Sequence, residues 1–67
     1  MIEVTINGAP RQFSAPLSFE QMLAEMALAG KRIAIERNGE IVPKSHFAHT
    51  QLADGDKLEV VVAVGGG

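Results

Sequence analysis

A single amphipathic helix restricts the fold of this chain more strongly than any other sequence pattern. Residues 17–30 repeat apolar side chains with a period of about 3.6 residues, which is typical of an α-helix. Ser18 and Gln21 form a capping-box sequence at its start, and Gly30 is expected to end it. The flanking segments alternate between apolar and polar residues, as strands do. Because one helix covers one sheet face, we expect an α+β fold with a mixed sheet. The apolar stripe of the helix consists of Phe19, Met22, Leu23, Met26 and Ala27.

Two Asn-Gly pairs are expected to form hairpin turns between strands. Asparagine and glycine both tolerate the positive φ that a two-residue hairpin turn requires. Ser45 is expected to cap a single helical turn that carries Phe47. The side chain of Asp54 is expected to form a hydrogen bond with the backbone two residues later in the chain. The Asn-Gly pairs occupy residues 7–8 and 38–39, and the expected strands occupy residues 1–7, 11–15, 32–37, 40–42 and 57–64.

The last strand is apolar on both faces. The residues expected to point toward the helix are Leu58, Val60, Val62 and Val64. Val61 and Ala63 point to the opposite face, which a single helix cannot cover. Scattered apolar residues are normal on surfaces, but together with Ala34 these two are expected to form a partner-binding patch. Val61→Asp should then weaken partner binding, whereas Val60→Asp should unfold the chain.

Composition excludes several classes of protein. The 67 residues suffice for one domain, 1–67, and no cysteine is present for a disulfide or a thiolate metal site. A net charge of -2 argues against nucleic-acid binding. No apolar run approaches the roughly 20 residues of a membrane span, and no secretory signal opens the chain. We therefore expect a cytoplasmic protein, monomeric alone, that binds neither nucleic acid nor membrane.

Few side chains could support catalysis. His46 and His49 could share one face of a helical turn, but two imidazoles without a third ligand make a poor metal site. Asp54 and Asp56 lie in a turn that lacks the full calcium-loop pattern. We therefore expect a protein that is not an enzyme and that binds no cofactor or metal itself.

Three glycines follow the last strand and end the chain. Residues 64–67 are expected to form a flexible tail, and three extended residues reach roughly 10 Å. A stretch without side chains can enter a channel too narrow for other residues. Gly66 is expected to thread such a channel, and the α-carboxylate of Gly67 is the reactive group delivered. This predicts a carrier whose carboxylate is activated and modified, the alternative being a frayed terminus.

Three stretches of the sequence carry a resemblance to a known family. Residues 37–43 read Arg-Asn-Gly-Glu-Ile-Val-Pro, residues 52–60 read Leu-Ala-Asp-Gly-Asp-Lys-Leu-Glu-Val, and residues 64–67 read Val-Gly-Gly-Gly. Together, in this order and ending at the chain terminus, they resemble the sulfur carrier of thiamine thiazole biosynthesis, the ThiS family. The resemblance covers essentially the whole chain and implies the ubiquitin-like β-grasp fold.

The resemblance also implies a mechanism and its partners. An E1-like, ThiF-type enzyme would use ATP and magnesium to adenylate the carboxylate of Gly67. A sulfur donor would convert the adenylate to a thiocarboxylate, and a ThiG-type thiazole synthase would use that sulfur. Gly66 matches the family's penultimate glycine, and Gly65 is a less diagnostic residue of the partner-bound tail. Nothing follows Gly67, so no proteolytic maturation is expected.

Three alternatives stay open. The small subunit of molybdopterin synthase is also a β-grasp sulfur carrier that ends in Gly-Gly, although such chains tend to be longer with a more proline-rich approach to the tail. A β-grasp module linked to RNA binding fits poorly with the net negative charge of the chain and with the glycine tail. A non-catalytic β-grasp interaction module would fit if the tail were inert.

Overall fold

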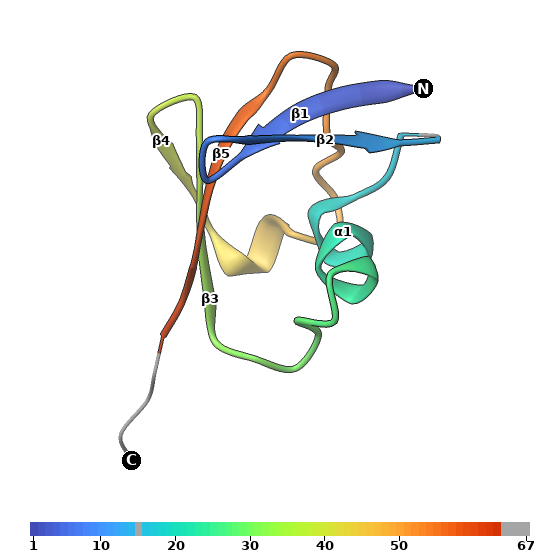
Figure 1. Ribbon diagram of the computed structural model, residues 1–67. Coiled ribbons are helices and arrows are strands. Elements are labelled where there is room, and N and C mark those ends of the chain that lie inside the picture. The colour runs from blue at the N-terminus through green and yellow to red at the C-terminus, as the bar shows by residue number, and fades with distance from the viewer. Residues whose placement is uncertain (15, 64–67) are drawn as a thin grey trace.

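The computed structural model describes residues 1–14 and 16–63, and the expected tail of residues 64–67 lies outside this part of the chain. Within it, one α-helix packs on one face of a five-stranded sheet (Figure 1). No helix of this part is long and apolar enough to cross a membrane. The elements are β1 (Ile2–Ile6), β2 (Ala9–Phe13), α1 (Phe19–Glu25), β3 (Ile33–Arg37), β4 (Glu40–Val42), the short 3-10 helix η1 (Lys44–His46) and β5 (Lys57–Val62).

The sheet is mixed, with strand order β2-β1-β5-β3-β4. β5 lies at its centre, parallel to β1 and antiparallel to β3. β2 and β4 are the edge strands, each joined by a hairpin to its neighbour. The first and last strands of the described chain therefore run side by side (Figure 1). The predicted α+β architecture, one mixed sheet with one main helix on one face, is confirmed.

The core lies between α1 and the sheet. The largest fully buried side chains come from three elements, namely Phe19 and Met22 of α1, Ile35 of β3 and Val4 of β1. Phe47, just after η1, closes the core, and its ring centroid lies 6.4 Å from that of Phe19. The other buried apolar residues are Ile6, Phe13, Leu17, Leu23, Leu52, Leu58 and Val60.

Both predicted hairpin turns are confirmed. Asn7 and Gly8 have φ of 51° and 84°, and Asn38 and Gly39 have φ of 50° and 91°. Because the first turn uses only these two residues, β2 begins at once, with Ala9 paired to Ile6. β2 is therefore Ala9–Phe13 and not residues 11–15 as predicted. A proline inside it is tolerated since β2 is an edge strand.

The helix begins where predicted but ends earlier. At its start, the Gln21 N–H donates to Ser18 Oγ at 3.1 Å and the Ser18 N–H donates to Gln21 Oε1 at 2.9 Å, which confirms the capping box. The helix ends at Glu25 and not at Gly30, because Ala27 takes a φ of 61°. The Leu28 N–H then donates across the end of the helix to a carbonyl of α1 at 2.8 Å. Ala27 is therefore exposed and not part of the apolar stripe.

Two local predictions after the second hairpin were wrong. Pro43, not Ser45, occupies the cap position of η1, and no side chain bonds the start of this helix. Proline has no backbone N–H, so Pro43 adds no unpaired donor to the start of this helix. Asp54 Oδ1 accepts from the Glu3 N–H at 2.8 Å, so it ties its turn to β1 and not to backbone two residues on.

Candidate partner-binding face

The sheet face opposite α1 brings together the side chains predicted to bind a partner. Val61 is 58% exposed, and its Cα pairs with that of Ala34, which is also exposed. Ala63 follows the end of β5, is exposed, and its N–H donates to the Arg32 carbonyl at 2.9 Å, which extends the β3–β5 ladder. The predicted patch of Ala34, Val61 and Ala63 is therefore contiguous along β3 and β5.

Ile41 lies on the same face, and the sequence analysis did not predict it there. It is 68% exposed and pairs with Glu36, which lies two residues from Ala34 on β3 and so points the same way. The tight turn at residues 38–39 sets this register, so counting outward from it would have found Ile41. We call Ala34, Ile41, Val61 and Ala63 the open-face strip.

Val62 was predicted to point into the core, but it is 41% exposed. It pairs with Ile33 at the last position of the β3–β5 ladder. On its other side β1 pairs with β5 only as far as Leu58, so no strand flanks Val62 there. The inward parity was correct for Leu58 and Val60, which are 2% and 7% exposed.

Asn7 holds β5 in place beyond the end of the β1–β5 ladder. Its Oδ1 accepts from the Val60 N–H at 2.8 Å, and its Nδ2 donates to the Val60 carbonyl at 3.0 Å. The amide side chain thus acts as one more strand residue on that side of β5. The residue that makes the turn therefore also anchors the strand that leads to the glycines.

Asn38 anchors the start of β5 in a similar way. Its Oδ1 accepts from the Lys57 N–H at 2.9 Å, and its Nδ2 donates to Asp56 Oδ1 at 3.2 Å. Asp56 is only 5% exposed; its Oδ2 accepts from the Ala53 N–H at 2.9 Å and lies 3.1 Å from Arg37 Nη2. Asp56 is therefore a buried anchor and not merely a turn residue.

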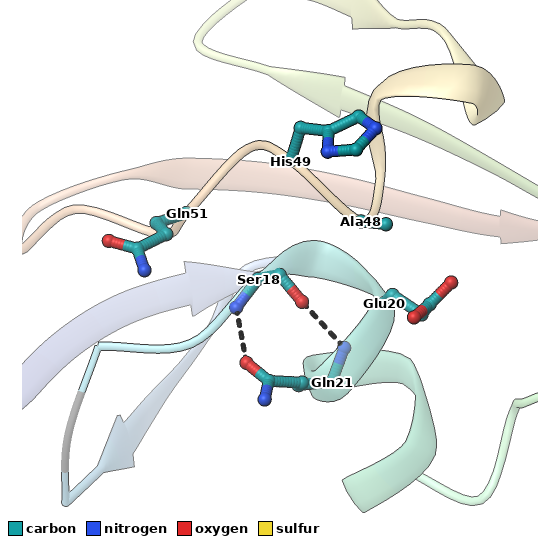
Figure 2. A pocket seen from close by; sticks show the side chains of 6 residues that line it. All are labelled: Ser18, Glu20, Gln21, Ala48, His49 and Gln51. Atoms are coloured by element: carbon teal, nitrogen blue, oxygen red, sulfur yellow. Dashed lines mark hydrogen bonds between the residues drawn. The ribbon is translucent and has the colours of Figure 1, made fainter.

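One hollow lies away from this face, beside the start of α1. Figure 2 shows its lining, with His49 above the hydrogen-bonded pair of Ser18 and Gln21. Its volume is about 490 Å³, and those two side chains are occupied in capping the helix. His46 and His49 are both exposed, and within residues 1–14 and 16–63 no three metal-ligating side chains cluster. Ser18 and Gln21 therefore serve the start of the helix.

The predicted tail residues Gly65, Gly66 and Gly67 lie outside the described residues. Their roles in threading a channel and in carrying the reactive carboxylate therefore stay predictions. What the structure supplies is the strand that precedes them, anchored by hydrogen bonds at Lys57 and at Val60.

Comparisons with known sequences agree with the resemblance found above. A family model described as the ThiS family matches residues 4–67. A thiazole synthase of Paramagnetospirillum magneticum is 47% identical over 66 residues, which are 98% of this chain but 20% of that protein, so the chain spans about a fifth of its length. Sulfur carrier protein ThiS of Bacillus subtilis is 38% identical over 50 residues, covering 75% of this chain and 76% of that protein.

Solved structures share the fold. The crystal structure of a thiamine biosynthesis protein, ThiS, from Geobacter metallireducens matches with a TM-score of 0.82 and 29% identity, covering 98% of this chain and 100% of that one. The solution structure of a thiamine biosynthesis protein from the same organism matches with a TM-score of 0.79. The fold is the ubiquitin-like β-grasp that the resemblance implied. With its family model matched from residue 4 to residue 67, this chain belongs to the ThiS family.

Proposed function

We propose that this chain is a sulfur carrier for thiazole formation in thiamine biosynthesis, and that it acts as a substrate of other enzymes. The observation that carries the proposal is the family match, which runs through residue 67 and so includes the terminal glycines. Among the described residues, both histidines are exposed and no three metal-ligating side chains cluster. The names of two relatives, a sulfur carrier protein and a thiazole synthase, favour thiamine over molybdenum-cofactor synthesis.

The proposed chemistry takes place at the carboxylate of Gly67. One carboxylate oxygen attacks the α-phosphorus of ATP, and pyrophosphate leaves with magnesium as its counter-ion. A sulfur donor at the oxidation level of hydrosulfide then attacks the acyl carbon. AMP departs with the oxygen, and the product is a thiocarboxylate. Thiazole synthase would take this sulfur, and both enzymes are proposed partners of this chain.

The open-face strip would dock the adenylating partner while the glycines reach its active site. Val61 and Ile41 are the large apolar side chains of this strip, at 58% and 68% exposure. Because β5 carries Val61 and also leads to the tail, docking on this face would position Gly65 and Gly66 relative to the partner's channel. Glycine at these positions would let the backbone approach the channel walls closely.

Pyrophosphate release by a purified adenylating partner tests this proposal. Adding one alanine after Gly67 moves the carboxylate about 3.5 Å along the chain, and Gly66→Val adds a branched side chain to the tail. The buried core residues lie between Val4 and Val60 in the sequence, so both proteins should fold normally and yet support no ATP-dependent pyrophosphate release. Glu25→Gln, an exposed change on α1, is the control and should behave as the unmodified chain. Normal release from the extended protein without proteolytic trimming would refute the proposal.

A further inference from the structure

Two glutamates face each other on the open side of the sheet. Glu36 of β3 and Glu59 of β5 are paired directly across the two strands. Each lies two residues from Ala34 or Val61 on its own strand, so both side chains lie on the same face as those residues. Side chains paired in this way have Cβ atoms roughly 5 Å apart, and like charges at that spacing destabilise a sheet. The pair thus opposes folding of the isolated chain.

Among residues 1–14 and 16–63, no salt bridge to either glutamate offsets this repulsion, although Lys57 lies on the same face of β5. By contrast, Asp56 is ion-paired to Arg37 at 3.1 Å on the other face. The fold therefore pairs its buried carboxylate and leaves two carboxylates unpaired on the face proposed to dock a partner.

The two glutamates lie within the apolar surface. Glu36 is half-buried; its cross-strand partner is Ile41 of β4, and Ala34 lies two residues away on its own strand. An open hollow of about 390 Å³ adjoins the pair, bounded by the two Asn-Gly turns and lined by Glu36, Lys57 and Glu59. A partner that covers Ile41 and Val61 would also remove water from these carboxylates, which is costly unless a cation accompanies it.

We propose that this face binds a basic side chain of the adenylating partner, an arginine, between Glu36 and Glu59. The guanidinium carries five donors in a planar fork that suits carboxylate oxygens. Its charge would cancel the repulsion between the glutamates at the moment when the apolar strip is covered. The acidic pair would therefore orient the partner, while Ile41 and Val61 supply the apolar contact. This inference rests on the proposed function and names the partner's chemistry.

The test compares Glu36→Gln and Glu59→Gln with the control Glu25→Gln. Because each test variant removes like-charge repulsion, its folding equilibrium constant in urea titrations should rise by about twofold to fivefold. In the adenylation assay its KM as a carrier should rise about tenfold or more, with kcat unchanged and a weaker dependence on salt. A purely structural role would not raise stability and KM together.

The outcomes are distinct. Unchanged KM and unchanged salt dependence in both variants would overturn the inference while leaving the proposed function intact, since the unmodified chain would still be adenylated. If the unmodified chain released no pyrophosphate, the proposed function itself would fail. Calorimetric binding of Ca²⁺ or Mg²⁺ to the isolated chain, abolished by Glu59→Gln, would show a metal ion in place of arginine and would also overturn it.

Discussion

Replacing Val60 and Val61, one at a time, with threonine tests the assignment of the two sheet faces. The residues are neighbours on β5, but Val60 is 7% exposed and Val61 is 58% exposed. Threonine has nearly the shape of valine and is also β-branched, so strand propensity hardly changes. The two variants therefore differ mainly in whether a hydroxyl is buried.

The expected magnitudes differ clearly. Burying a hydroxyl without a partner costs about 1–3 kcal/mol in proteins, which we assign to Val60→Thr. An exposed substitution usually stays within about 0.5 kcal/mol, which we assign to Val61→Thr. For a domain of this size each kcal/mol lowers Tm by about 4–8 °C. Urea titration should show a lower midpoint for Val60→Thr with an unchanged slope. Equal losses in the two variants would refute the assignment of faces.

Two further predictions concern the backbone anchors and the helix end. Asn7→Gly keeps the positive φ but removes both hydrogen bonds to Val60, so it should lower the free energy of unfolding by about 1–3 kcal/mol. A loss below about 0.5 kcal/mol, measured by urea titration, would show that Asn7 does not anchor β5. Ala27→Gly relieves a φ of 61° that costs an L-residue about 1–2 kcal/mol. After the greater unfolded-state entropy of glycine is subtracted, it should raise Tm by a few degrees, and a lower Tm would contradict the reading of the helix end.

Local rules predicted the elements that depend on neighbouring residues. The capping box of Ser18 and Gln21 and the turn at residues 38–39 each rest on contacts a few residues apart, and both were confirmed. The end of the helix was wrong because glycine is the usual residue with positive φ, whereas here Ala27 adopts it. The hydrogen bond of the Leu28 N–H to the last turn of α1 compensates for that conformation.

Predicting the candidate site required more knowledge of strand pairing between distant residues than predicting the helix and the turns did. Parity along β5 was enough to place Val61 opposite the helix. Ile41 could have been found by counting outward from the turn at residues 38–39. The facing glutamates 36 and 59 needed the register of β3 against β5, which sequence alternation alone does not give. The anchoring roles of Asn7 and Asp56 could not be predicted either, because Val60 lies 53 residues from Asn7 and Asn38 lies 18 residues from Asp56.

Intact-protein mass spectrometry with fragmentation can decide whether the carboxylate of Gly67 accepts sulfur. The chain is incubated with the adenylating partner, ATP, magnesium and a sulfur donor, and its mass is compared with that of a sample without ATP. We expect one oxygen to be replaced by sulfur, with fragments that place the change at Gly67. An unchanged mass under conditions in which an established ThiS carrier is converted, or sulfur at any other residue, would contradict this expectation.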